Sequence, residues 1–209
     1  MKCGGSGFDY GKYRTVGRPP AYKFHQLLFG ASKMRKILSK HYIKSDKNTR
    51  VLDLCCGTCD IIPYLEFKEY VGVDLNKKYI LHNKAKFASI TNASFYCADV
   101  NAFIEENNTK FNVVLLLLAM HHIDDASLKT LLKNIFRALP THGRLVTIDG
   151  CRESNITLFE KYLFDNDRGK FIRTKEEYIE IFLSIFKDYQ YTISRDLYHI
   201  PYNSIIFNR

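Results

Sequence analysis

The stretch from Val51 to Asp60, VLDLCCGTCD, constrains the fold of this chain more than any other feature. Four apolar-leaning residues, typical of a buried parallel strand, run into a tight turn of small residues, and a helical pattern follows. A strand that passes through such a turn into a helix directs backbone N–H groups toward a ligand. The segment therefore predicts the first strand of an open α/β sheet, with a ligand site at its carboxyl end.

Strand and helix patterns alternate after this segment. Strands are expected near residues 50–55, 70–74, 94–98, 111–118 and 143–149, and helices near 60–66, 76–88, 101–107 and 127–139. Two closing strands, near 189–199 and 203–208, have the short spacing of an antiparallel pair. The alternation predicts an α/β fold with a seven-stranded, mostly parallel sheet, an antiparallel last strand and helices on both faces.

The two ends of the chain differ in composition. Residues 1–19 are rich in glycine and basic residues, and they predict a flexible leader that ends at Pro19-Pro20. An amphipathic helix is expected from about Ala21 to Tyr42, and residues 20–209 are expected to form a single domain. Near the other end, Thr174 and Glu177 have the spacing of a capping box that opens a helix reaching about residue 186.

Hydropathy and charge limit the location and the partners of the chain. The longest apolar run, Val113 to Met120, is far shorter than the roughly twenty residues of a membrane span. The N-terminus lacks the apolar stretch of a secretory signal, so a cytoplasmic protein is expected. A net charge of +9 is compatible with nucleic acid or acidic lipid as a partner. The lysines are scattered, however, which favours a solvated surface over nucleic-acid binding.

Three acidic residues mark the ends of the first three expected strands. Asp53 precedes the tight turn, Asp74 ends the strand expected in YVGVDLN, and Asp99 ends the strand expected in SFYCADV. Acids at these positions suit ribose hydroxyls and an adenine amino group. Asp74 and Asp99 can also cap the helices that follow them, although Asn76 is better placed than Asp74 for that task. We favour binding of an adenosine-containing ligand.

The order of VLDLCCGTCD, YVGVDLN, YCADV, FNVVLLLLAMHHIDD and LPTHGRLVTID resembles that of class I S-adenosylmethionine-dependent methyltransferases. It is similar to the small-molecule branch that includes quinone-type enzymes. The resemblance covers residues 20–209 and is strongest between 50 and 150. It implies a Rossmann-like methyltransferase fold and transfer of a methyl group from S-adenosyl-L-methionine to a small-molecule acceptor. No NPPY-like segment follows the fourth strand, which disfavours amide or nucleobase-amine acceptors, so oxygen is favoured. S-Adenosylhomocysteine would be the product.

The resemblance also implies the residues that contact the cofactor. The family's first motif is an acid followed by G-x-G-x-G, in which Asp53 and Gly57 match while Cys55 and Cys59 replace glycines. Because a Cβ disfavours positive φ, negative φ is expected at both cysteines. Asp74 would accept from the ribose, Asp99 from the adenine amino group, and Val100 would offer its N–H to the ring. The implied set is Asp53, Cys55, Gly57, Asp74, Leu75, Asp99, Val100 and Ala119, with Tyr10 and Tyr13 of the leader as a lid.

Acceptor residues are expected after the fourth strand and before the last helix. His121 or His122 can take a proton from an acceptor hydroxyl or amine, or simply hydrogen-bond neighbouring backbone. The segment FDNDRGKFIRTKEEY resembles one that borders the acceptor pocket. Within it, Arg168 and Arg173 can hold an anionic group, or can instead form surface ion pairs with neighbouring aspartates.

Three other readings of the first loop are possible. Cys56 and Cys59 form a CxxC at a helix start, as in thioredoxin-like thiol–disulfide oxidoreductases. No aromatic residue precedes the motif, and that fold would leave the acidic strand ends unexplained. A zinc site is disfavoured because no second CxxC pair accompanies these cysteines, so no metal is expected. The cysteine replacements also leave open a domain that binds S-adenosylmethionine without transferring its methyl group.

Overall fold

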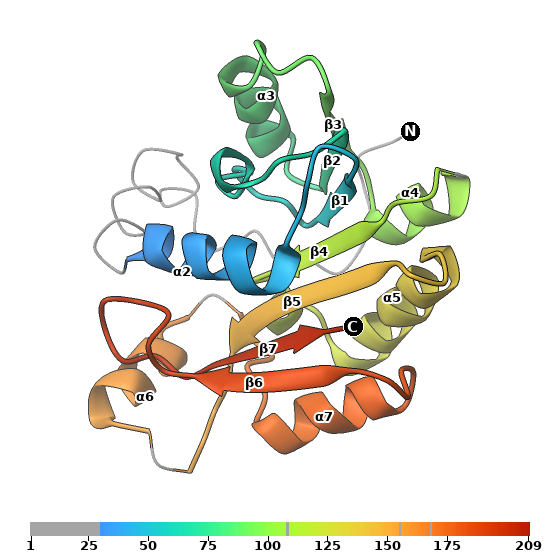
Figure 1. Cartoon of the computed structure of the whole chain (residues 1–209). Helices are drawn as coiled ribbons and strands as arrows, with labels where there is room; N and C mark the ends of the chain where they lie inside the picture. Colours follow the sequence, from blue (N-terminus) through green and yellow to red (C-terminus); the bar gives the residue numbers. More distant parts are fainter. Residues whose placement is uncertain (1–29, 108, 155, 168) are drawn as a thin grey trace.

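Seven strands form one sheet in the computed structural model, which describes residues 30–107, 109–154, 156–167 and 169–209 (Figure 1). The strands are β1 (Arg50–Leu54), β2 (Glu69–Asp74), β3 (Ala93–Cys97), β4 (Val113–Leu117), β5 (Arg144–Gly150), β6 (Gln190–Ser194) and β7 (Ser204–Asn208). Their order across the sheet is β3-β2-β1-β4-β5-β7-β6. β7 pairs antiparallel with both β5 and β6, whereas β1 to β5 pair in parallel. The mostly parallel sheet with an antiparallel last strand is therefore confirmed.

Helices cover both faces of this sheet (Figure 1). They are α2 (Ala31–Ile37), η1 (Leu38–Ile43), η2 (Ile62–Tyr64), α3 (Lys77–Lys86), α4 (Val100–Glu106), η3 (Met120–His122), α5 (Asp125–Ala138), α6 (Leu158–Asp165) and α7 (Lys175–Leu183). α4, α5 and α7 pack on one face, and α2, η1, η2 and α3 pack on the other. α2 continues without a break into η1, which has π-helical geometry.

Alternate residues of the strands supply two separate cores. In β4, Val114 and Leu116 face the α5 side, whereas Val113 and Leu115 face the α2 side. All four of these side chains are buried. A strand covered on both faces needs a continuous apolar run rather than an alternating pattern. This requirement accounts for the sequence VVLLL in the middle of the sheet.

Two predicted elements are shorter in the structure. The helix expected at 60–66 is the single 3-10 turn η2, which contains Pro63 and ends at Leu65 in an extended conformation. A proline in the first turn removes no helical hydrogen bond, so the element stops because the backbone turns extended at Leu65. The strand expected at 189–199 stops at Ser194, where its pairing with β7 ends.

One helix was not predicted, and one prediction extends beyond the described residues. α6 begins with a capping box in which Thr157 and Glu160 bond each other reciprocally. This local signal is present in the sequence and could have revealed the helix. Of the helix expected from Ala21 to Tyr42, the structure describes the part from Ala31, while the leader lies outside the described residues.

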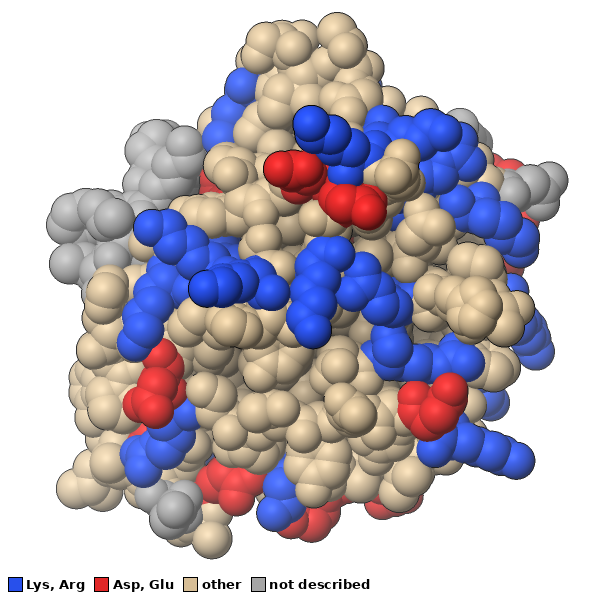
Figure 2. Space-filling model, in the orientation of Figure 1, with Lys and Arg blue, Asp and Glu red and all other residues tan. Residues whose placement is uncertain are grey.

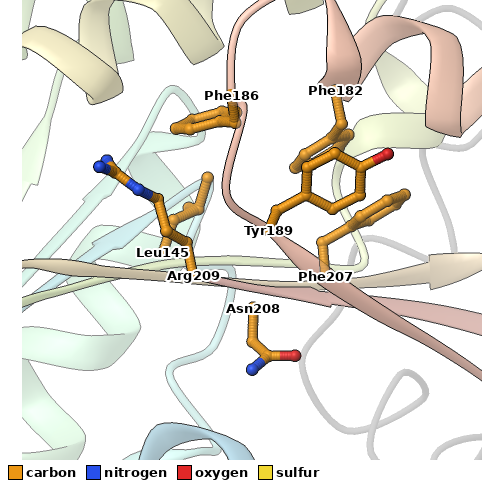
Figure 3. Close-up of a pocket in the computed structure, with 7 residues that line it drawn as sticks. All are labelled: Leu145, Phe182, Phe186, Tyr189, Phe207, Asn208 and Arg209. Atoms are coloured by element: carbon orange, nitrogen blue, oxygen red, sulfur yellow. The ribbon is translucent and has the colours of Figure 1, made fainter.

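A small hollow lies at the amino edge of the sheet, near the start of β5 and the end of β7 (Figure 3). It is lined by Leu145, Phe182, Phe186, Tyr189, Phe207, Asn208 and Arg209. Phe182 stacks on Phe207 with a centroid distance of 3.8 Å, and the Arg209 guanidinium lies 5.8 Å from the Phe186 ring centre. These side chains fasten α7 to the sheet, at the edge opposite the ends of the parallel strands.

Among the described residues, none of the helices combines the length and the apolar character needed to cross a bilayer.

Candidate active site

The loop between β1 and η2 contains three residues with positive φ. Cys55 has a φ of 55°, Gly57 of 52° and Cys59 of 50°. The predicted negative φ at the two cysteines is therefore wrong. The tight turn needs left-handed backbone at these points, where Cys56 N–H donates to Val73 O and Cys59 N–H donates to Cys56 O. A left-handed residue other than glycine costs about 1–3 kcal/mol, so the loop is strained.

Contacts from β2 and α3 hold this strained loop. A Cβ at Gly72 would lie 3.1 Å from Cys56 Sγ and 3.2 Å from Cys59 Sγ, so glycine leaves room for both sulfurs against β2. The buried Asn83 amide of α3 donates to Gly57 O at 2.7 Å and to Cys59 Sγ at 3.1 Å. The cysteines therefore contribute packing that glycines could not supply.

Asp74 connects this loop to the end of β2. Its Oδ2 accepts from Gly57 N at 2.9 Å, and its Oδ1 accepts from Asn76 N at 2.7 Å. Burial raises the pKa of Asp74, although the two backbone hydrogen bonds act in the opposite direction. Asn76, and not Asp74, caps α3 by accepting from Lys78 N. A carboxylate can accept about four hydrogen bonds, so Asp74 keeps capacity for ribose hydroxyls.

Asp99 caps helix α4 in this structure. Its Oδ1 accepts from Asn101 N at 3.0 Å and from Ala102 N at 3.1 Å. Asp99 is therefore a helix cap, as the sequence allowed. Both of these hydrogen bonds use the same carboxylate oxygen. Contact between Asp99 and adenine remains a prediction. Leu75 is half-buried after β2, and Val100 is buried at the start of α4.

Asp53 is buried at the end of β1, with an exposed fraction of 3%. The Tyr70 hydroxyl from β2 donates to its Oδ2. Burial raises the pKa of Asp53 to about 7, the hydrogen bond from Tyr70 lowers it, and the charge of Asp74 raises it further. The carboxyl group therefore belongs to the supporting layer beneath the loop.

Open space borders the loop at Gly57. A Cβ at this residue would meet no atom within 4 Å. The ends of β1, β2 and β4 meet along this edge, and Ala119 follows β4 after Leu118, which also has positive φ at 54°. The carboxylate oxygens of Asp74 and the open space beside Gly57 both lie at the carboxyl edge of the sheet, and together they suit a nucleoside ligand.

His121 lies in the 3-10 turn after β4 and contacts a buried carboxylate. Its backbone N–H donates to Asp149 Oδ2 at 3.1 Å, and its ring Nδ1 is hydrogen-bonded to Asp149 Oδ1. Asp149 is fully buried near the end of β5 and also accepts from Gly150 N at 2.8 Å. His121 Nε2 lies 3.5 Å from Asp167 Oδ1, in the segment before α7.

The Asp149 carboxylate orients the His121 ring. When Nδ1–H is donated to Asp149, Nε2 is the ring nitrogen that faces Asp167. Of the two predicted histidines, His121 contacts Asp149, and the ring of the half-buried His122 lies 4.1 Å from it. Asp149 was not predicted, although an acid at the end of the fifth strand, LVTID, was visible in the sequence.

Arg173 fastens a segment over His121. It is 4% exposed, and its guanidinium donates to Asp125 and to the backbone carbonyls of Met120, Ile123 and Phe171. All three guanidinium nitrogens are engaged in this way, so the geometry gives Arg173 a positioning role instead of the predicted contact with an acceptor.

Two backbone features complete this segment. Phe171 N–H donates to His121 O at 3.0 Å. A Cβ at Gly169 would overlap the His121 ring, so the segment approaches the imidazole as closely as glycine allows. Arg168, Tyr10 and Tyr13 were also predicted to contribute to the site, and they lie outside the described residues.

The CxxC pair lacks the properties of a redox centre. Cys56 and Cys59 carry free thiols. The hydrogen bond with Cys59, followed by burial, raises the pKa of Cys56 well above its ordinary value. A thiol–disulfide oxidoreductase instead needs a lowered thiol pKa, so this geometry opposes the redox reading.

Comparison with known proteins finds similarity to methyltransferases. A family model described as a methyltransferase domain matches residues 51–143. Demethylmenaquinone methyltransferases of two Leptospira interrogans serovars are 27% identical over 128 residues, which cover 56% of this chain and 51% of theirs. The chain thus spans about half the length of these curated relatives.

Solved structures share the fold. The plantazolicin methyltransferase BamL, determined with S-adenosylhomocysteine (SAH), has a TM-score of 0.65 and 15% identity, and the match covers 92% of this chain and 91% of BamL. The pyocyanin biosynthetic protein PhzM has a TM-score of 0.66 and 16% identity, with 92% of this chain and 59% of PhzM covered. These matches confirm the Rossmann-like fold that the sequence predicted.

The strain at Cys55 predicts a specific order of stabilities. Cys55→Val, with a branched Cβ at φ 55°, should destabilise the protein by about 1–3 kcal/mol. Cys55→Gly should leave the free energy of unfolding within about 1 kcal/mol of the wild type, because relief of strain offsets the added freedom of the unfolded chain. Urea unfolding measures both, and equal stability of the two variants would contradict a strained loop.

The raised pKa of Asp53 predicts a pH-dependent stability. Between its ordinary pKa of 3.8 and the folded value of about 7, the folded protein binds a proton that the unfolded chain has lost. The contribution of this group to stability therefore falls as pH rises through that window and is constant above it. As pH rises from about 5 to 8, the free energy of unfolding of Asp53→Asn should fall less than that of the wild type, by about 1–3 kcal/mol. Parallel pH profiles in urea unfolding would refute the assignment.

Proposed function

We propose that this chain, which carries a class I S-adenosylmethionine-dependent methyltransferase domain, transfers a methyl group from S-adenosyl-L-methionine to an oxygen of a small-molecule acceptor. The observation that carries this proposal is the His121–Asp149 pair at the edge of the sheet where Gly57 borders open space. A base held by a buried carboxylate suits an acceptor that must lose a proton as it attacks. S-Adenosylhomocysteine is then the second product.

The residues at the strand ends would hold the methyl donor. Asp74 accepts from the ribose hydroxyls, while Asp99 and the N–H of Val100 contact the adenine. Leu75, Gly57 and Ala119 line the same edge of the sheet. When bound, S-adenosylmethionine supplies a methyl group on a positively charged sulfur, which is already activated toward nucleophiles. Alignment then supplies much of the rate.

His121 and Asp149 would manage the proton. The acceptor hydroxyl gives its proton to His121 Nε2 while its oxygen forms the bond to the methyl carbon. The electrons of the broken carbon–sulfur bond remain on sulfur. Asp149 accepts the Nδ1–H of the ring and stabilises the imidazolium that forms. Arg173 acts through position, because it holds the segment that covers His121.

A quinone-type acceptor is the finer form of the proposal. The similarity to demethylmenaquinone methyltransferases supports this class of acceptor, whereas the preference for oxygen rests on the His121–Asp149 pair. A cytoplasmic location remains a prediction that accompanies it. A domain that binds S-adenosylmethionine without turnover is the competing function. Formation of S-adenosylhomocysteine with a panel of hydroxylated aromatic acceptors tests the proposal, and binding without turnover across the panel would favour the competitor.

The first expected outcome concerns Asp74. Asp74→Ala should weaken binding of S-adenosylhomocysteine at least tenfold, because a charge-assisted hydrogen bond is worth about 1.5–3 kcal/mol. Titration calorimetry measures this affinity. Asn76→Ala is the matched control, since it removes a neighbouring hydrogen bond that only caps α3. Equal affinities for wild type and Asp74→Ala would remove ribose from the assignment.

The second expected outcome concerns the proton. His121→Ala should lower kcat by about 10²–10⁴, because this is the usual contribution of a general base. Asp149→Asn should lower kcat in the same direction while His122→Ala leaves it within a few-fold. Affinity for S-adenosylhomocysteine should persist in all three, which separates loss of the base from loss of the fold. A kcat for His121→Ala equal to that of the wild type would show that proximity alone suffices.

A further inference from the structure

Helix α6 turns large apolar side chains toward solvent. Leu158 is 87% exposed, Phe159 is 50% exposed and Tyr162 is 62% exposed. Positions 158, 159 and 162 lie on one side of a helix, so the three side chains form a single apolar patch. Isolated apolar residues at a surface are common, but a cluster of this size on one helix marks a contact site.

The opposite side of α6 is firmly attached. Glu160 is fully buried and accepts from Arg195 Nη2 at 2.6 Å and from Asn203 N at 3.2 Å. The buried Phe164 ring lies 4.9 Å from that of Tyr202. These contacts fix α6 against the loop between β6 and β7. The exposure of the apolar patch therefore results from how the helix is anchored.

A row of lysines follows α2 and η1. Lys33, Lys36, Lys40, Lys44 and Lys47 are all exposed. The spacing of Lys33, Lys36 and Lys40 places them along one side of the helix, and Lys44 and Lys47 follow its end at Ile43. Figure 2 shows Lys and Arg side chains gathered in a band across the face that α2 and η1 occupy. Asp46 is the one acidic residue between positions 30 and 50.

The lysine row and the apolar patch meet at the same loop. Lys33 Nζ donates to Tyr198 O at 3.3 Å, so α2 begins against the loop between β6 and β7. α6 contacts this loop through Arg195, Tyr202 and Asn203. Helices that carry positive charge and apolar side chains therefore lie against the same loop.

We propose that this surface docks on an anionic lipid bilayer. Apolar side chains of an interfacial helix enter the boundary between headgroups and acyl chains, and lysines contact the phosphates. The net charge of +9 suits such a surface. A nucleic acid would engage the lysines but would leave Leu158 and Phe159 in water. This proposal rests on the apolar patch and the lysines, and it does not depend on which acceptor the proposed active site binds.

Vesicle binding tests the proposal. The full chain should co-sediment with vesicles that contain phosphatidylglycerol and much less with pure phosphatidylcholine, and added salt should weaken the binding. Lys36→Glu with Lys40→Glu should weaken it at least about tenfold. Leu158→Ser with Phe159→Ser should do the same, because the inserted apolar area is lost.

Matched controls lie on other helices of the molecule. Leu183 on α7 is 60% exposed, and Lys133 and Lys187 are exposed on or next to α5 and α7. Leu183→Ser and the pair Lys133→Glu with Lys187→Glu should bind vesicles like the wild type. Circular dichroism confirms that every variant is folded.

A fluorescent reporter separates insertion from purely electrostatic binding. The chain contains no tryptophan, so Phe159→Trp provides a single emission probe. Its emission should shift to the blue with anionic vesicles, while that of Leu183→Trp should not.

Four results would each overturn the proposal. They are absence of vesicle binding, wild-type binding by Leu158→Ser with Phe159→Ser, an unshifted Phe159→Trp spectrum, and displacement of the vesicles by single-stranded RNA. None of these results bears on formation of S-adenosylhomocysteine, which tests the proposed function separately.

Discussion

The hydrogen bond from Gly57 N–H to Asp74 Oδ2 joins the ends of β1 and β2, and the geometry of the site depends on it. The loop that it holds contains two cysteines in a conformation that costs free energy for any residue with a Cβ. Asn83 and the space at Gly72 supply the remaining support. The strained turn persists because β2 and α3 fix it, and the open side at Gly57 remains available to a ligand.

His121, the proposed base, is supported by segments that are far apart in the sequence. β4 ends next to His121, β5 supplies Asp149 almost thirty residues later, and Arg173 closes the arrangement from the segment before α7. Each contact restrains a different degree of freedom: the ring orientation, the turn that carries the ring, and the cover above it. Preorganisation of this kind spares the reaction the cost of arranging the groups.

Much of the sheet could be predicted from the sequence because strands buried on both faces leave continuous apolar runs, as in VVLLL of β4. The acids at the strand ends were visible for the same reason. The partnership of Asp149 with His121 could not be predicted from local patterns, since it depends on how β4 and β5 pair. The positive φ at Cys55 and Cys59 was missed because residue preference indicated the opposite, and tertiary contacts overrode it. The capping box of α6, in contrast, was a readable signal that was overlooked.

Gly169 has a consequence for how this chain can change over time. A side chain at that position would occupy the volume of the His121 imidazole, so substitution there would push the ring away from Asp149. The segment cannot gain bulk at this point, even though its neighbour Asp167 reaches the same ring with a side chain. Sequence change in this segment is therefore constrained most at position 169, where the absence of a side chain preserves the packing of the imidazole against Asp149.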